Sequence, residues 1–282
     1  MAIIDGKKIA QEIRNKLGKE ASKLKEEGRA PGLSVVLVGS DPASETYVNM
    51  KKKAAQNLDI RSEVHQLEED IPEAELFDLI DTLNNDNRVD GILVQLPLPE
   101  HINPDQVIEA IVPDKDVDGF HPLNTGRLFN GQQEGLRFEA CTPLGIIELI
   151  ERSTEIDGKK AVIVGRSNIV GKPTAHLLLD RHATVTICHS HTPDLKKETL
   201  QADILVAAAG YPRLISGDMV KEGATVIDVG INRVNGELVG DVNFDQAEKR
   251  AAHITPVPGG VGPMTITMLM ENTIKARKYH GI

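Results

Sequence analysis

The sequence contains no tryptophan, and aromatic residues make up only 3% of its 282 positions. Hydrophobic residues nevertheless reach 40%, so the cores must be built mainly from isoleucine, leucine, valine and alanine. Aliphatic cores of this kind are typical of parallel α/β architecture, in which both faces of the strands are buried. Because the chain is longer than one typical domain, we expect two domains.

Cysteine is also scarce. Cys141 and Cys188 are the only two, which gives no disulfide framework and indicates a reducing compartment. The sequence has neither the apolar segment of a signal peptide nor a run of about 18 apolar residues that would cross a membrane. A formal net charge of −10 argues against a general nucleic-acid binder but allows a local basic pocket for an anion. No spacing of cysteine, histidine and carboxylates typical of a metal site occurs, so we expect a cytoplasmic α/β protein without a metal ion.

Residues 1–111 alternate between helical and strand patterns. The spacing of apolar residues over 7–27 predicts an amphipathic helix, and the run 33–38 predicts a buried strand. Ser44 is placed to cap the next helix. The alternation favours a mostly parallel sheet. The other elements predicted in this part are a helix to residue 57, a strand at 63–67, a helix at 73–84, a strand at 91–96 and a helix at 104–111.

Proline, glycine and aspartate are concentrated in residues 112–142, which predicts a loop-rich connection near a domain boundary. After it, buried strands and helices alternate again, and residues 256–265 contain too many glycines and prolines to be regular. The elements predicted in this second half are a helix at 144–152, strands at 160–164, 184–188, 203–208 and 225–229 with helices between them, and a last helix at 264–278.

Residues 158–171, GKKAVIVGRSNIVG, combine a short apolar strand, a glycine turn and the start of a helix. This combination is typical of a phosphate-binding site, because glycines allow close backbone approach and unpaired helical N–H groups face the anion. The middle glycine of the dinucleotide fingerprint G-x-G-x-x-G is missing. An ordinary strand-to-helix turn in an enzyme that binds no nucleotide is therefore the alternative at this point.

The strand at 184–188 indicates which nucleotide would bind. An NAD site usually places an aspartate or glutamate after the second strand, where it holds the ribose 2′-hydroxyl. Here the strand is followed by His189, Ser190 and His191, with no acid. An arginine and a serine without a carboxylate suit a 2′-phosphate, so Arg166 and Ser190 favour NADP over NAD. The two histidines could contact the phosphate, although exposed histidines are common at strand ends.

Tyr47 and Lys51 lie four residues apart and share one face of the predicted helix. A tyrosine can orient an amine or relay a proton, which sets Lys51 apart from Lys52 and Lys53, for which a solvated helix face is expected. Gln95 lies at the carboxyl end of an apolar strand, where ligands bind in parallel sheets. The alternative to a role in ligand binding is that Gln95 only forms a structural hydrogen bond with the backbone of a loop.

Three further features have either a binding role or a purely structural one. Asp116 and Asp118, in the segment DKDVDGF, are either binding residues or turn formers. Residues 258–263, PGGVGP, line a site or form only a rigid connection. Cys141 either fills a small buried space or contacts a ligand.

Six motifs follow one another along nearly the whole chain. They are ASETYVNMKKKAA (43–55), GILVQLPLP (91–99), PDKDVDGFHPLNTGRL (113–128), CTPLG (141–145), GRSNIVGKP (165–173) and PVPGGVGPMT (256–265). Together they resemble the motifs of the bifunctional methylenetetrahydrofolate dehydrogenase/cyclohydrolase family, and their order and spacing make the resemblance specific.

The resemblance implies two domains with the folate in a cleft between them. Residues 1–140 with 266–282 would form the substrate and catalytic domain, and residues 141–265 a Rossmann-like NADP-binding domain with a parallel sheet. The implied activity is oxidation of 5,10-methylenetetrahydrofolate to 5,10-methenyltetrahydrofolate with NADP, followed by hydrolysis to 10-formyltetrahydrofolate. Since the family is typically homodimeric, we expect a homodimer.

The resemblance also assigns roles to individual residues. Lys51 would be the central catalytic group, with Tyr47 stacking on or orienting the pterin and Gln95 helping to set the protonation of the lysine. Asp118 would hold the amino-pyrimidine end of the pterin. The substrate-binding residues would be Ser44, Tyr47, Asp118, Pro258, Gly259 and Gly260, and the cofactor-binding residues Gly165, Arg166, Ser167, Ser190 and Ile231.

Three competing interpretations make different demands on the sequence. A dehydrogenase without effective cyclohydrolase activity, or one using NAD, is the nearest, and the missing acid argues against NAD. A nucleotide-sensing binding protein would lack the set Tyr47, Lys51 and Gln95, which is complete here. An amino-acid or hydroxy-acid dehydrogenase of similar two-domain plan would not explain the segment PGGVGP together with YVNMK.

Overall fold

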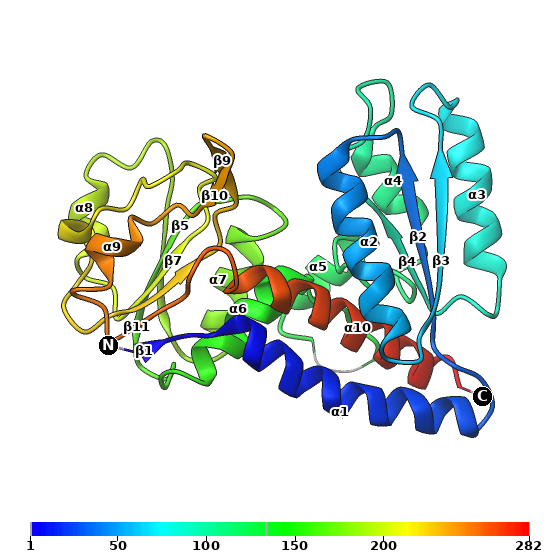
Figure 1. The fold of residues 1–282 in the computed structure, drawn as a ribbon, viewed down its shortest axis with the longest axis horizontal. Helices are drawn as coiled ribbons and strands as arrows, with labels where there is room; N and C mark the ends of the chain where they lie inside the picture. Colours follow the sequence, from blue (N-terminus) through cyan, green and yellow to red (C-terminus); the bar gives the residue numbers. More distant parts are fainter. Residues whose placement is uncertain (1, 133–134, 282) are drawn as a thin grey trace. The chain divides into compact units, whose positions relative to one another are not determined.

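The computed structural model describes residues 2–132 and 135–281, which form two compact units (Figure 1). Unit 1 comprises Met1–Gln11 and Thr142–Thr265, and unit 2 comprises Glu12–Cys141 and Ile266–Ile282. The chain passes from one unit to the other three times, once after Cys141 and twice within long helices. These are α1 (Gly6–Glu26) and α10 (Val261–Tyr279).

The division differs from the expected one at the amino terminus, which the sequence placed with residues 12–140. Strand β1 (Ala2–Ile3) pairs in parallel with β11 (His253–Ile254), so the first residues belong to unit 1. Two-residue strands are too short to produce a periodic hydrophobic pattern, which explains why neither was expected. The functional assignment of the two parts stays a prediction.

Unit 1 is built on a six-stranded sheet in the order β1-β11-β8-β7-β5-β6, in which every pairing is parallel. The strands are short aliphatic runs, and all four residues of β7 and of β8 are buried. The carboxyl ends of β5, β7 and β8 therefore lie along one edge, where open α/β sheets bind ligands. The remaining strands of this sheet are β5 (Lys160–Val164), β6 (Thr184–Cys188), β7 (Ile204–Ala207) and β8 (Thr225–Asp228).

A two-stranded antiparallel hairpin follows β8 and was not expected from the sequence. Its strands are β9 (Asn232–Val234) and β10 (Glu237–Val239). Asn235 and Gly236 between them have φ values of 52° and 87°, as the tight turn of a hairpin requires. The helices of this unit are α6 (Cys141–Glu151), α7 (Gly171–Leu179), α8 (Leu195–Thr199), the 3₁₀ turn η1 (Gly217–Met219) and α9 (Phe244–Ala247).

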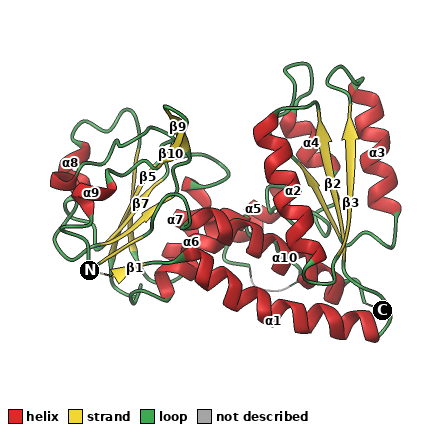
Figure 2. Ribbon diagram, viewed as in Figure 1, coloured by secondary structure: helices red, strands yellow, loops and turns green. Residues whose placement is uncertain are grey.

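Unit 2 contains a three-stranded parallel sheet in the order β3-β2-β4. All seven residues of the central strand, GLSVVLV, are buried, as expected for a strand covered on both faces. Figure 2 shows helices α2, α3 and α4 around these strands. The bounds are β2 (Gly32–Val38), α2 (Pro42–Gln56), β3 (Arg61–Leu67), α3 (Glu73–Asn85), β4 (Gly91–Val94), α4 (Pro104–Ala110) and α5 (Pro122–Phe129).

Helix α5 lies in the stretch 112–142 that was expected to be loop, of which 133 and 134 are outside the described residues. It begins with Pro122, and the ring nitrogen Nδ1 of His121 accepts the backbone N–H of Leu123 at 3.0 Å. Histidine is not one of the side chains by which a helix start is normally recognised, so the pattern gave no signal. The expected fold class, two α/β units with parallel sheets, is confirmed.

The glycine- and proline-rich stretch 256–265 is also partly wrong as a prediction, because α10 already begins at Val261. Pro263 falls in the first turn of that helix, where proline is tolerated because the N–H groups there have no intrahelical partner. Similarly, α6 begins at Cys141, three residues before its expected start, with Pro143 in its first turn.

Candidate active site

Helix α2 carries three of the predicted site residues, namely Ser44, Tyr47 and Lys51. Its N-cap is Asp41, whose carboxylate accepts the backbone N–H of Ser44 at 2.8 Å, so the prediction that Ser44 caps the helix is wrong. Proline at the first helical position places the cap one residue before Pro42. Ser44 lies in the first turn and is buried, and Tyr47 is half-buried, which raises the pKa of its hydroxyl.

Lys51 is only 8% exposed, whereas Lys52 and Lys53 are exposed. Its Nζ donates a hydrogen bond to Oε1 of Gln95 at 2.9 Å. Nε2 of Gln95 in turn donates to the carbonyl of Leu96 at 2.6 Å. The amide is therefore fixed at both ends, with its oxygen toward the ammonium. Gln95 lies just beyond β4, which ends at Val94 rather than at residue 96 as expected.

Asp118 completes a charged group with Lys51. Burial raises the pKa of the Asp118 carboxyl, and attraction to the nearby Lys51 ammonium opposes that rise. Cys141 lies against the same carboxyl, and its Sγ donates to the carbonyl of Val117 at 3.3 Å. Burial raises the pKa of this thiol well above its ordinary value. At 1% exposed, Cys141 fits the first of its two expected roles, filling a small buried space, and its contact with a ligand stays a prediction.

Asp116, two residues earlier, has a structural role in the loop. Its carboxylate accepts the backbone N–H groups of Gly119, Phe120 and His121 at 3.2, 3.2 and 2.8 Å, and Nδ2 of Asn124 at 2.9 Å. Burial raises its pKa to about 6 although these hydrogen bonds oppose the rise. Asp116 is therefore a turn former, and Asp118 is the carboxylate that faces Lys51.

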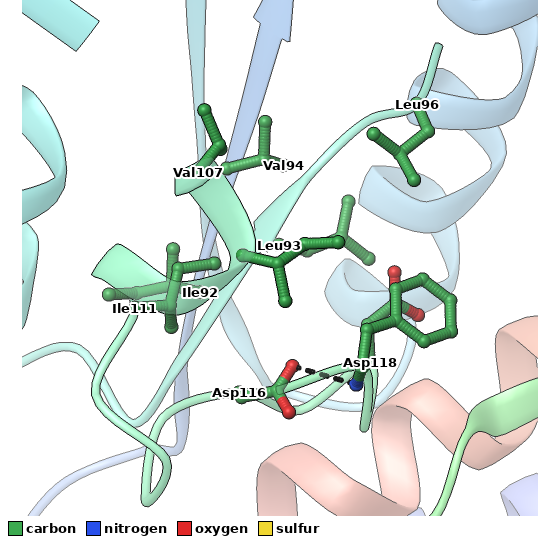
Figure 3. A pocket seen from close by; sticks show the side chains of 10 residues that line it. Ile92, Leu93, Val94, Leu96, Val107, Ile111, Asp116 and Asp118 are labelled. Atoms are coloured by element: carbon green, nitrogen blue, oxygen red, sulfur yellow. Dashed lines mark hydrogen bonds between the residues drawn. The ribbon is translucent and has the colours of Figure 1, made fainter. Parts of the chain in front are cut away.

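A small pocket lies beside this loop. Figure 3 shows Asp116 and Asp118 next to the apolar side chains of β4. Its wall is mostly aliphatic, and a low-polarity wall strengthens the interaction of a neighbouring carboxyl with charges. The lining residues are Ile92, Leu93, Val94, Leu96, Val107, Ile108, Ile111, Asp116, Asp118 and Phe120.

Asn272, on α10, holds this loop and was missed by the sequence interpretation. It is 2% exposed, and its Nδ2 donates to the carbonyls of Val117 at 2.9 Å and Glu139 at 3.1 Å. The amide thus ties the Asp118 loop to the segment before Cys141. Its partners are backbone carbonyls more than 130 positions away, so no local spacing in the sequence could have revealed it.

The predicted cofactor loop follows β5 in unit 1. Gly165 has a φ of 135°, and a Cβ there would lie 2.1 Å from the carbonyl oxygen of Ala208. A Cβ on Gly171 would in turn lie 2.2 Å from the carbonyl oxygen of Gly165. The first and last glycines of the motif are therefore needed, because strand, turn and helix α7 pack at backbone contact.

Ser167 changes the expected picture of this loop. Its Oγ accepts the backbone N–H groups of Val170 at 3.1 Å and Gly171 at 3.3 Å. Its carbonyl accepts the N–H of Lys172 at 3.1 Å. The expectation that unpaired helical N–H groups face an anion is therefore wrong for these three groups, because the serine in the turn already satisfies them.

Ser167→Ala should lower the free energy of unfolding by about 1 kcal/mol in the absence of any cofactor, because the N–H groups of Val170 and Gly171 lose their hydrogen-bond acceptor. Urea denaturation of the isolated protein measures the change. Ser190→Ala is the matched control, because this exposed serine lies at no helix start. The free energy of unfolding of this variant should equal that of the wild type. Equal stability of Ser167→Ala and the wild type would show that the hydroxyl does not support α7.

The other predicted cofactor residues are exposed. Arg166, Ser190 and Ile231 all lie at the surface of unit 1, and no side chain within the described ranges forms an ion pair or hydrogen bond with Arg166. The backbone N–H of Gly165 donates to the carbonyl of Cys188 at 2.9 Å, so the loops bearing Arg166 and Ser190 leave neighbouring strands side by side. Both groups are therefore available to a ligand at the carboxyl edge of the sheet.

Pro258, Gly259 and Gly260 precede α10 in unit 1. The carbonyl of Gly259 accepts the N–H of Lys7 at 3.1 Å, and a Cβ on Gly6 would lie 1.9 Å from the carbonyl oxygen of Gly260. The loop thus packs on the start of α1. Lys51 and Asp118 belong to unit 2, and the expected meeting of the two sets around a ligand stays a prediction.

Within residues 2–132 and 135–281, no group of three or more histidine, cysteine, aspartate or glutamate side chains is arranged to hold a metal ion. None of the helices in these ranges is long and apolar enough to cross a membrane.

Comparison with known proteins gives two family-model matches. The model for the catalytic domain of tetrahydrofolate dehydrogenase/cyclohydrolase matches residues 4–118, and that for its NAD(P)-binding domain matches residues 140–281. The bifunctional protein FolD of Halothermothrix orenii is 70% identical over 281 residues, with 99% of each chain covered.

Two solved structures are similar over the whole chain. The bifunctional enzyme FolD of Campylobacter jejuni has a TM-score of 0.96 and 51% identity, with 99% of each chain covered. FolD of Trypanosoma brucei, solved with NADP cofactor and an inhibitor, has a TM-score of 0.93 and 42% identity, covering 99% of this chain and 97% of that one.

Proposed function

Because the chain belongs to the tetrahydrofolate dehydrogenase/cyclohydrolase family, we propose that it oxidises 5,10-methylenetetrahydrofolate with NADP and then hydrolyses the 5,10-methenyl product to 10-formyltetrahydrofolate. The observation that carries the proposal is the placement of the buried Lys51 beside Gln95, which accepts its hydrogen bond, and Asp118, whose carboxyl its charge attracts. Nζ of Lys51 donates to Gln95, and its charge attracts the Asp118 carboxyl, so the buried cation has partners that offset its loss of hydration.

The oxidation moves a hydride from the methylene bridge of the folate, and NADP, when bound, supplies the acceptor carbon of its nicotinamide. No general base is required for this step, because the product is the methenyl cation. The task of the protein is to position the two reactants, which supplies much of the rate of a reaction between bound partners. Tyr47 and Asp118 would orient the pterin, and Asp118 would accept hydrogen bonds from its amino-pyrimidine end.

The hydrolysis adds water to the methenyl carbon and opens the ring, which requires protons to move to and from the adduct. Lys51 is placed for this task, because its Nζ is nearly buried and Gln95 fixes the direction of one of its hydrogen bonds. The positive charge of the methenyl group beside the amine favours release of the lysine proton. Lys51 therefore serves as the general acid and base of the second reaction.

The residues of unit 1 fit the dinucleotide. Gly165 and Gly171 let the turn between β5 and α7 pack at backbone contact, as the tight turn of a dinucleotide site requires. Arg166 is an unpaired cation in this turn among the described residues. Ser190 stands where an NAD site would carry an acid. Arg166 and Ser190 would hold the 2′-phosphate, and Ser167 and Ile231 would contact the rest of the cofactor.

Two assays on one preparation test the two halves of the proposed function. The protein is mixed with 5,10-methylenetetrahydrofolate and NADP, NADPH formation is followed, and the disappearance of added methenyltetrahydrofolate is measured separately without cofactor. We expect both reactions to proceed. Absence of NADPH formation would refute the dehydrogenase proposal, and hydrolysis at the uncatalysed rate would refute the cyclohydrolase proposal.

Arg166→Ala should raise the KM for NADP by about 10-fold and leave the KM for NAD nearly unchanged, because one charge-assisted hydrogen bond to the 2′-phosphate is lost. Steady-state kinetics with both cofactors measure the two constants. Lys249→Ala removes another exposed cation of unit 1, near the amino end of β11, and should change neither. A wild-type preference for NAD would contradict the assignment of Arg166 and Ser190.

The homodimer and the cytoplasmic location expected from the sequence remain part of this proposal. Strand β6 lies at one edge of the sheet. Ile187, on this strand, is 39% exposed, and Leu179, at the end of α7, is 57% exposed. An edge strand with exposed apolar residues favours pairing with a second copy. A molar mass from light scattering of twice 30.7 kDa is the expected result.

A further inference from the structure

Two buried aspartates lie beneath the carboxyl edge of the unit 1 sheet, and neither has a part in the proposed reaction. Asp241, after β10, is fully buried, and Asp228, the last residue of β8, is 3% exposed. Carboxylates are rarely buried without hydrogen-bond partners, because only such partners offset the free energy lost when the group leaves water. The partners of these two are almost all backbone N–H groups of the loops along that edge.

Asp228 joins the end of β8 to the strand that returns from the hairpin. Its Oδ1 accepts the N–H groups of Gly230 at 3.0 Å and Asp241 at 2.9 Å, and its Oδ2 accepts that of Val242 at 2.9 Å. A Cβ on Gly240 would lie 1.8 Å from Oδ2. Asp228 therefore fixes the position of Asp241.

Asp241 then holds two loops at once. Its Oδ2 accepts the N–H groups of Ala209 at 2.6 Å and Gly210 at 2.8 Å, in the loop after β7. Its Oδ1 accepts a hydrogen bond from Nδ2 of Asn232 at 2.9 Å. Asn232 is the first residue of β9 and directly follows Ile231, which ends the loop after β8. The carboxylate is the link between the two loops, and every partner it has here is a donor.

The loop after β7 is also the surface on which the Gly165 turn rests. A Cβ on Gly165 would lie 2.1 Å from the carbonyl oxygen of Ala208 and 3.4 Å from the nitrogen of Ala209. The peptide that Asp241 holds is therefore the one against which the turn packs. Any shift of that peptide moves Gly165, and Arg166 and Ser167 follow it in the chain.

We propose that Asp241 is a positioning residue for NADP, which sets the Gly165 turn and the Ile231 loop at the spacing that the bound dinucleotide requires. This inference rests on the proposed cofactor role of unit 1. It assigns Asp241 no contact with the cofactor. The residue acts through the backbone of Ala209 and Gly210 and through Asn232.

Asp241→Asn provides the test. Asparagine has one acceptor oxygen and one donor group, so whichever way the amide turns, a buried N–H on one side faces another N–H. An unsatisfied buried donor weakens the arrangement that holds the loops. We expect the Kd of NADPH, measured by its fluorescence, to rise about 10-fold or more. The KM for folate and the cofactor-independent hydrolysis of methenyltetrahydrofolate should stay at wild-type values.

The sign of the change separates positioning from simple electrostatics. Removing a negative charge near an anionic cofactor would by itself tighten NADPH binding, whereas loss of positioning weakens it. Asp245→Asn is the matched control, since it removes an exposed carboxylate of α9 by the same substitution. Unchanged or tighter NADPH binding by folded Asp241→Asn, alongside an active wild type, would overturn the inference.

A second variant decides the question if Asp241→Asn does not fold. Asn232→Ala removes the partner of Oδ1, together with the 3.4 Å hydrogen bond from the same Nδ2 to the carbonyl of Val239. It leaves the bonds of Asp241 to Ala209 and Gly210 in place. We expect it to fold and to raise the Kd of NADPH about 3-fold, with folate KM unchanged. An unchanged Kd in Asn232→Ala would overturn the inference. Failure of the wild type to use NADP would instead refute the proposed function itself.

Discussion

Lys51→Met should abolish hydrolysis of methenyltetrahydrofolate, with a loss of about 10²- to 10⁴-fold in kcat, the range that a general acid or base contributes. Methionine preserves the length and much of the packing of the lysine stem but cannot carry a proton. The dehydrogenase reaction should fall far less, because the oxidation needs no proton acceptor. Separate assays of the two reactions on the same preparation measure the difference.

Lys52→Met and Lys53→Met are the controls for this prediction. Both lysines are neighbours of Lys51 on α2, and both are exposed. Each substitution removes one positive charge from the same helix, so any general effect of charge on folate binding would appear in all three variants. Normal cyclohydrolase turnover by Lys51→Met would refute the catalytic role of this residue.

Asp118→Asn should raise the KM for folate by about 10- to 100-fold in both reactions, because a buried ionic hydrogen bond to the pterin becomes a neutral one. The substitution is nearly isosteric, so the loop held by Asp116 should keep its shape. The KM for NADP should not change. Steady-state kinetics with varied folate and varied NADP measure the two constants independently.

Asp114→Asn removes a negative charge from the same loop, at a position where the structure places no hydrogen bond of its side chain with another described residue. It should leave both KM values at the wild-type level. If Asp118→Asn also left the folate KM unchanged in both reactions, Asp118 would be a structural partner of Lys51 and Cys141 rather than a pterin ligand.

The parallel sheets could be predicted because their strands are continuous aliphatic runs. The runs 33–38 and 160–164 emerge as β2 and β5 with nearly the expected bounds. Burial on both faces leaves no alternation to interpret, so length and β-branching carry the signal. The two-residue strands β1 and β11 give no such signal, and their pairing depends on backbone brought together from opposite ends of the chain.

The candidate site was predictable where its members share a local pattern. Tyr47 and Lys51 share a helix face, and Gln95 is a polar group at the end of an apolar strand. The contact of Lys51 with Gln95 agrees with that expectation. Asn272 and Asp241 could not be found in this way, because their partners are backbone groups that only the folded chain brings near. The family resemblance is confirmed by the two family models, while the individual roles stay predictions.

The hydroxyl of Ser167 has a consequence for the entropy of ligand binding. In a loop with a free helix terminus, the anion of the ligand must itself order the turn. Here the serine oxygen already satisfies the N–H groups of Val170 and Gly171, so the turn loses its conformational freedom when the chain folds. Fixing the backbone of one residue costs about 1–2 kcal/mol in conformational entropy. A turn ordered beforehand leaves correspondingly more of the interaction with a ligand to appear as affinity. The serine oxygen thus accepts, in the protein without ligand, the hydrogen bonds that an anion would otherwise accept from these two N–H groups.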